Sequence, residues 1–255
     1  MKRLLALVYG ILCYLFFLGT FLYTIGFVGN VGVPKSIDSV PTSPPLEAAV
    51  IDAFLLSIFA VQHSVMARHA FKQQWTRIVS WYLERSTFVL AATLALALVL
   101  WQWRPITPVV WDLRGTVFAS LLAVLFWVGW AILLISTTLI NHFELCGLDQ
   151  VWAYFHGREF ERPPFKTPAF YRCVRHPLYL GFVIAFWSAP VMTAGHLLFS
   201  IATTGYILVG IYFEERDLVR AYGEAYREYR RRVPMLFPWR RPTPVEAEPE
   251  HRQAA

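Results

Sequence analysis

Residues 4–28 read LLALVYGILCYLFFLGTFLYTIGFV and contain no charged side chain. A helix needs about 20 mostly apolar residues to cross the hydrocarbon core of a bilayer. This stretch is longer than the apolar core of a typical secretory signal, and no small-residue cleavage site follows it. The sequence therefore predicts a retained membrane helix here.

Further apolar segments are separated by short polar connections, at residues 46–66, 86–103, 115–140, 177–193 and 196–213. The last two are short and meet near Gly195, so we expect a helical hairpin. With 56% hydrophobic and 16% charged residues and a mean hydropathy of +0.45, the chain is more apolar than an ordinary soluble domain. We therefore predict an all-α polytopic membrane protein with about four transmembrane helices, a C-terminal helical hairpin and a cytoplasmic amphipathic helix.

Basic residues are distributed unevenly between the loops. With the N-terminus inside, two lie before the first span, four in residues 67–85, five in 141–176 and nine after 213. Only Lys35, Arg104 and Arg114, of 23 in all, then lie outside. Because basic residues in short loops stay in the cytoplasm, we predict that both termini are cytoplasmic. The net charge of +6 follows from this bias and does not indicate nucleic-acid binding.

Cysteine and histidine spacing gives no sign of a metal site. Cys13, Cys146 and Cys173 form no CxxC pair, and the last two lie on the predicted cytoplasmic side, where disulfides are rare. The histidines form no HExxH motif or tight ligand pair. We predict neither a disulfide framework nor a bound metal.

The most informative motif is YRCVRHPLYLG at residues 171–181, where a cytoplasmic loop enters an apolar helix. Pro177 suits the first turn of that helix, whose free N–H groups and partial positive charge can bind an anion. Arg175 and His176 would stand beside this end. The alternative is an interfacial anchor, since arginine and aromatic residues also mark the headgroup level.

Glu214 and Glu215 follow the last apolar segment at the membrane boundary. Acidic groups beside a span are costly unless paired or hydrated, and they indicate a functional site. A hairpin would return them to the membrane face that carries Arg175 and His176. Beyond them, a single helical stripe is predicted by spacings of three and four residues, at Leu218, Tyr222, Tyr226, Tyr229 and Val233. The alternative for this segment is an interfacial helix on anionic lipid.

Four motifs, taken in order, resemble the isoprenylcysteine carboxyl methyltransferase superfamily. They are RHPxYxG at residues 175–181, EExxL at 214–218, GxxYxxY at 223–229 and VP at 233–234. In that family this region forms the pocket for S-adenosylmethionine. The resemblance implies cofactor-binding roles for nine residues: Arg175, His176, Pro177, Tyr179, Gly181, Glu214, Glu215, Tyr226 and Tyr229. It also implies three parts: membrane helices in residues 1–140, the cofactor-binding region in 141–238, and a Pro-rich tail in 239–255 that we predict to be disordered.

The N-terminal half resembles the NnrU-like branch of this superfamily, through QHSVMAR at residues 62–68, NHFELCGL at 141–148 and FYR at 170–172. Within that branch it is most similar to the bacterial methanethiol S-methyltransferases, although Cys146 stands where an aromatic residue is expected. The resemblance implies S-adenosylmethionine-dependent methylation of a small thiol in the bacterial inner membrane. The resemblance also implies contact with membrane lipid, and this methyl transfer requires no metal.

Candidate catalytic residues follow from the chemistry of thiols. A free thiol titrates at about pH 8.5 or higher, so something must accept its proton. His142 and Glu144 are two residues apart and can converge only if a helix ends there, which Gly147 favours. His63 is the next candidate, although a histidine near the end of a span more often satisfies a neighbouring helix. For Asp52, inside the second span, we favour structural pairing.

Two alternative functions remain open at this point. One is methylation of a larger prenylated or lipid-like acceptor through a wider lateral opening. The other is a non-catalytic, NnrU-like membrane protein.

Overall fold

The structure is a computed structural model that describes residues 1–160 and 166–238. Within these residues, five helices are long and apolar enough to cross a membrane. They are α1 (Lys2–Gly29), α2 (Pro45–Ala67), α4 (Trp81–Gln102), α5 (Val117–Ile140) and α9 (Ala194–Tyr222). The chain is therefore a multi-pass, all-α membrane protein, as predicted. The predicted tail, 239–255, lies outside the described residues.

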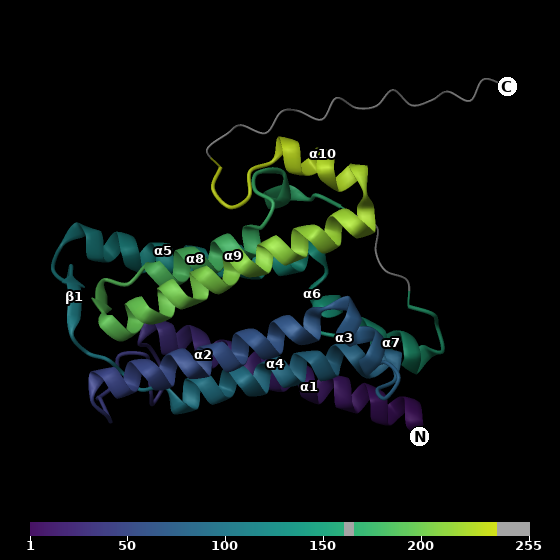
Figure 1. The fold of residues 1–255 in the computed structure, drawn as a ribbon, viewed down its shortest axis with the longest axis horizontal. Coiled ribbons are helices and arrows are strands. Elements are labelled where there is room, and N and C mark those ends of the chain that lie inside the picture. The colour runs from purple at the N-terminus through teal and green to yellow at the C-terminus, as the bar shows by residue number, and fades with distance from the viewer. Residues whose placement is uncertain (161–165, 239–255) are drawn as a thin grey trace.

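Shorter elements connect these helices. They are α3 (His69–Trp75), β1 (Val109–Asp112), α6 (His142–Leu145), α7 (Leu148–His156), the 3₁₀ helix η1 (Ala169–Arg172), α8 (Pro177–Trp187), β2 (Val191–Thr193) and α10 (Glu224–Arg232). Figure 1 shows α3, α6 and α7 near the end of the molecule that holds the N-terminus, with β1 at the opposite end. The long axis of the molecule joins these two ends.

The helices form two layers (Figure 1). In one layer, α1 and α2 pack against α4, and α7 covers the ends of α1 and α4. In the other, α5 packs along α8, which also contacts α9. The layers meet where α2 contacts α9. The fourth predicted span, α5, therefore lies beside the C-terminal hairpin.

The outer surfaces of the long helices are apolar. Leu12 is 60% exposed, Phe54 65% and Phe118 64%. A helix that is apolar on the faces away from its neighbours is typical of a membrane span, because lipid replaces water around it. This exposure supports the membrane assignment independently of helix length.

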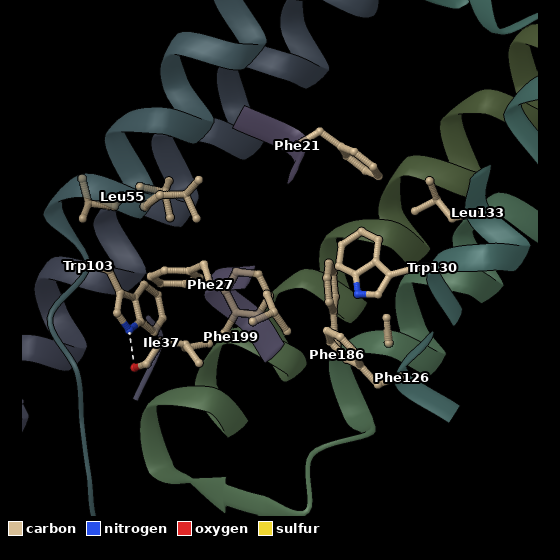
Figure 2. Close-up of a cluster of buried hydrophobic side chains, with 14 residues drawn as sticks. Phe21, Phe27, Ile37, Leu55, Trp103, Phe126, Trp130, Leu133, Phe186 and Phe199 are labelled. Atoms are coloured by element: carbon tan, nitrogen blue, oxygen red, sulfur yellow. Dashed lines mark hydrogen bonds between the residues drawn. The ribbon is translucent and has the colours of Figure 1, made fainter. Parts of the chain in front are cut away.

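A buried aromatic cluster joins the two layers (Figure 2). Trp130 of α5 meets Phe21 of α1 edge-on, with ring centroids 5.4 Å apart, and lies 6.0 Å from Phe186 of α8. Trp103, after α4, donates its indole N–H to the carbonyl of Ile37 at 3.1 Å. Aromatic pairs at such separations contribute about 0.5–1.5 kcal/mol each beyond burial. The cluster fixes the layers to each other.

Helices α5 and α8 approach through glycines. A Cβ added to Gly181 would lie 2.6 Å from the carbonyl oxygen of Gly129, and one added to Gly129 would lie 2.7 Å from that of Gly181. Small residues permit such close backbone contact between membrane helices. Gly181, which the resemblance assigned to cofactor binding, thus lies in a helix contact.

The structure corrects the boundaries of the predicted hairpin. The segment 177–193 is not one helix: α8 ends at Trp187, and 191–193 form β2, which pairs antiparallel with β1 through Val109 and Thr193. Pro190 explains the end of the helix, because a proline lacks the N–H and disfavours helical geometry at the residue before it.

The predicted helical stripe from Leu218 to Val233 is also divided. Helix α9 continues past Phe213 to Tyr222, Gly223 adopts φ 59° and ψ −127°, and α10 begins at Glu224. A positive φ suits glycine and ends a helix. The spacing of three and four residues persists across this break, so the sequence pattern predicts one helix where there are two.

Candidate active site

The two ends of the α8–α9 hairpin converge. Arg175 and His176 precede Pro177, the first residue of α8, and Glu215 lies on α9. Arg175 donates from Nε to Oε1 of Glu215 at 2.7 Å, and His176 Nε2 lies 3.1 Å from the same oxygen. Nδ1 of His176 lies 3.8 Å from Oε2 of Glu214. The convergence expected from the hairpin is therefore present in the structure.

The segment after α10 covers this cluster. Arg175 Nη1 donates to the carbonyl oxygens of Arg230 and Val233, at 2.9 and 2.7 Å. The backbone N–H groups of Arg175 and His176 donate to the carbonyls of Pro234 and Met235. Residues 230–235 thereby pack directly against the start of α8.

Charges at the centre of the site are largely shielded from solvent. The Arg175 and Glu215 side chains are each 11% exposed, and Arg230 Nη1 lies 3.7 Å from the second oxygen of Glu215. Removing a charge from water costs several kcal/mol unless a partner compensates it. The opposite charges and hydrogen bonds around Glu215 supply that compensation, so the carboxylate stays ionised and fixed in place.

Glu214 differs from Glu215. Its Oε2 atom is buried and has no hydrogen-bond partner among the described residues, although the Glu214 side chain as a whole is 43% exposed. A buried carboxylate oxygen normally accepts a hydrogen bond. The carboxyl also interacts with the phenol of Tyr179. An open acceptor beside an otherwise satisfied cluster fits a ligand that carries ammonium or hydroxyl donors.

The tyrosines of α10 face this region. Tyr226 is only 1% exposed, and its ring lies 5.7 Å from that of Tyr229. Tyr229 donates its O–H to the carbonyl of Tyr171 at 2.6 Å. Burial raises the pKa of both Tyr226 and Tyr229, so both remain neutral phenols. Tyr229 thereby holds α10 to the loop that precedes α8.

His142 lies in a second group of polar residues, at the end of α5. Asn141 adopts φ 106°, and its side chain caps α6 by accepting the N–H of Glu144. This turn points His142 at two hydroxyl groups: Tyr14 of α1 lies 3.1 Å from Nε2, and Thr137 of α5 lies 3.1 Å from Nδ1. The helix end anticipated from Gly147 is present.

The partners of His142 include residues on other helices. Within the described residues its hydrogen bonds go to Tyr14, Thr137 and Cys146, and burial lowers its pKa. Tyr14 stands 128 residues away in the sequence, so spacing could not reveal it. The sequence signal that could have identified Tyr14 is its hydroxyl group within an apolar span, at a membrane depth close to that of the predicted site.

Tyr171 connects the two groups. Its phenol donates to the carbonyl of Ser136, next to Thr137, at 3.5 Å, and its own carbonyl accepts from Tyr229. The His142 turn and the Arg175 cluster therefore border on opposite sides of one loop.

His63 and Asp52 occupy other surroundings. His63 Nδ1 lies 2.7 Å from the hydroxyl of Tyr206 on α9, and its ring packs 5.1 Å from that of Phe88. This is the contact with a neighbouring helix that we expected. Asp52 is fully buried and accepts the backbone N–H of Arg104 at 2.8 Å, which agrees with structural pairing.

Comparison with known proteins identifies close relatives. The chain is 54% identical to a methanethiol S-methyltransferase of Mycobacterium tuberculosis, over 94% of this chain and 98% of that protein. It is 53% identical to methanethiol S-methyltransferase 1 of Bradyrhizobium diazoefficiens, over 94% of this chain and 84% of that protein. Nurim of Mus musculus is 33% identical over 66% of each chain. No family model matches the chain, and no solved structure matches it.

Proposed function

Because the chain belongs to the methanethiol S-methyltransferase family, we propose that it methylates methanethiol to dimethyl sulfide, with S-adenosylmethionine as the methyl donor. The observation that carries this proposal is identity of about half over nearly the whole length of both chains.

The donor site is proposed at the hairpin ends and α10. A bound S-adenosylmethionine supplies a sulfonium-activated methyl group. Oε2 of Glu214, which is buried and accepts no hydrogen bond among the described residues, fits its hydroxyl or ammonium donors, and Arg175 suits its carboxylate. The remaining proposed donor-site residues shape or support the pocket: His176, Pro177, Tyr179, Gly181, Glu215, Tyr226 and Tyr229. Among them, Gly181 would act by bringing α8 against α5, and Tyr229 by fixing α10.

The acceptor site is proposed beside His142. The lowered pKa of His142 keeps its ring neutral around pH 7, so that it has a lone pair for the thiol proton. Glu144 lies on the same turn, and His63 remains the next candidate should His142 not be the acceptor. Formation of the thiolate is the step that needs the protein, because most of the thiol is protonated at neutral pH.

The low polarity of the surroundings favours the transfer itself. The negative charge of the thiolate and the positive charge of the donor diminish together as the new bond forms. A pocket that excludes water stabilises this less polar transition state relative to separated charges, and it holds the two sulfur atoms in line. A small apolar thiol can reach such a pocket from the lipid, which also receives the product.

The proposed setting is the bacterial inner membrane, with both termini and the active site in the cytoplasm. The distribution of basic residues supports this orientation. The cell also supplies soluble methyl donor on that side.

A headspace assay on the purified, detergent-solubilised chain tests the function. Methanethiol, hydrogen sulfide and a prenylcysteine analogue are offered separately with S-adenosylmethionine; volatile products are measured by gas chromatography, and methylation of the prenyl analogue by mass spectrometry of the solution. We expect dimethyl sulfide from methanethiol, and the Arg175→Ala variant serves as the control for background. A rate no greater than that without enzyme would refute the proposal, and methylation of the prenyl analogue alone would point to a larger acceptor.

A further inference from the structure

The hydrogen bonds around His142 determine which of its nitrogens carries the proton. The hydroxyl of Thr137 donates its only proton to the carbonyl of Leu134, at 2.8 Å. Toward Nδ1 of His142, 3.1 Å away, Thr137 can therefore only accept. Nδ1 must then carry the hydrogen, and in a neutral imidazole the lone pair stands on Nε2.

The lone pair on Nε2 points at Tyr14. The phenol oxygen lies 3.1 Å from Nε2, so the Tyr14 O–H donates to it. Tyr14 is half-buried on α1, and its ring meets that of His142 edge-on at 5.7 Å between centroids. The only other contact on this nitrogen among the described residues is the Cys146 sulfur, at 3.9 Å. The proton acceptor is thus covered by a phenol.

We propose that Tyr14 relays the proton of the acceptor thiol to His142, and that Thr137 is a positioning residue that holds His142 in the Nδ1–H form. This inference rests on the proposed thiol methylation and adds the route of the proton. As the thiol S–H bond breaks, its proton passes to the Tyr14 oxygen, and the Tyr14 proton passes to Nε2 of His142. The products are a thiolate, a neutral tyrosine and an imidazolium, so charge and protons balance.

Two other ionisable groups nearby, Cys146 and Arg85, do not supply an alternative base. Cys146 is 4% exposed, and burial raises its pKa to about 11, so it remains a thiol at neutral pH. Arg85 of α4 is cationic and donates to the carbonyl of Leu145. Tyr14 and His142 remain as the pair with matched donor and acceptor.

The first test removes one oxygen atom. Tyr14→Phe keeps the ring and deletes the relay hydroxyl, and Tyr9→Phe is the matched control, because Tyr9 lies on the same helix and bonds Thr87 instead. We expect kcat of Tyr14→Phe to fall about 10²-fold at pH 7, the low end for a lost acid–base group, with the affinity for S-adenosylmethionine unchanged. The defect shrinks as the pH approaches the pKa of the thiol, since the thiolate then forms without a relay. A defect that high pH does not repair, or wild-type turnover, overturns the relay.

The second test observes the tautomer directly and does not depend on turnover. Imidazole ¹⁵N NMR of protein in nanodiscs, with the His142 signal identified by its loss in His142→Gln, distinguishes Nδ1–H from Nε2–H. We expect Nδ1–H in the wild type and in Thr137→Ser, and a mixture in Thr137→Val. An Nε2–H form in the wild type overturns the positioning role of Thr137. If the Nδ1–H form is present but no dimethyl sulfide is made, the proposed function and the relay both fail, while the assignment of Thr137 stands.

Discussion

At Glu215, one carboxylate contacts two arginines and a histidine, and these contacts make it the structural centre of the proposed donor pocket. Arg175, His176 and Arg230 approach it from the start of α8 and from α10. The same contacts that fold the C-terminal region therefore shape the pocket. A substitution here tests both properties, and they must be measured separately.

We expect Arg175→Ala and Glu215→Ala each to weaken S-adenosylmethionine binding by at least tenfold, about 1.4 kcal/mol, because each removes one partner of a largely buried ion pair at the pocket wall. Isothermal titration calorimetry on the solubilised variants measures this. Arg227→Ala is the control, since its ion pair with Glu224 is exposed on both sides. Wild-type affinity in both pocket variants would remove the shared-pocket model.

His142→Ala should lower turnover more than it lowers donor affinity. The residue acts as a base only when neutral, and burial lowers its pKa, so wild-type kcat stays level through the neutral range and declines as the pH falls through that pKa. The variant loses the base and regains activity toward the pKa of the thiol. A pH–rate profile checks this. Unchanged turnover at pH 7 would make His63 the next residue to replace.

At the scale of the elements, the close contact of α5 and α8 positions the start of α8. A Cβ on Gly181 would meet the carbonyl oxygen of Gly129 at 2.6 Å and the N atom of Leu133 at 2.8 Å. These are backbone atoms, which cannot turn aside as a flexible side chain can. The helices must separate, and Arg175 and His176 move with α8.

Gly181→Ala should therefore destabilise the protein by about 1–3 kcal/mol, the usual effect of overpacking, and lower its Tm. Thermal unfolding in detergent, followed by circular dichroism, measures the shift. Gly205→Ala on α9 is the matched control, because an added Cβ there has no atom within 4 Å. Equal effects of the two substitutions would show that the contact does not constrain the helices.

The membrane helices and the convergence of the motifs at the two ends of the hairpin could be predicted from the sequence. Contacts between residues that are distant in the chain could not. Apolar length identified the membrane helices, and the hairpin brought Arg175 to Glu215 because both stand at its ends. The pairing of β1 with β2 depends on two loops 80 residues apart, and the helix break at Gly223 leaves the apolar spacing intact. Tyr14 reached His142 only through the packing of α1, which no local pattern encodes.

At the scale of the whole molecule, the two layers of helices run side by side along the long axis, and one buried cluster connects them (Figure 1). The cluster includes Ile37 and Trp103 and extends to Trp130 and Phe186 (Figure 2). The elements α6 and α10, which carry residues of the proposed site, lie nearer the end that holds the N-terminus than β1 does (Figure 1).

The same axis determines the topology that we expect. Lys35, Arg104 and Arg114 belong to the β1 end, whereas the other basic residues lie before the first span, in residues 67–85 and 141–176, and after residue 213. A reporter fused after Pro238 should therefore be active only if it is a cytoplasmic reporter. One inserted near Ser39 should be active only if it is an external reporter, since basic loops resist translocation. Green fluorescent protein serves as the cytoplasmic reporter and alkaline phosphatase as the external reporter. Each is placed at both positions, and the four fusions control for differences in expression. The reversed pattern would put the proposed donor pocket on the side of the membrane where the cell supplies no S-adenosylmethionine, and the proposed function would fail with the orientation.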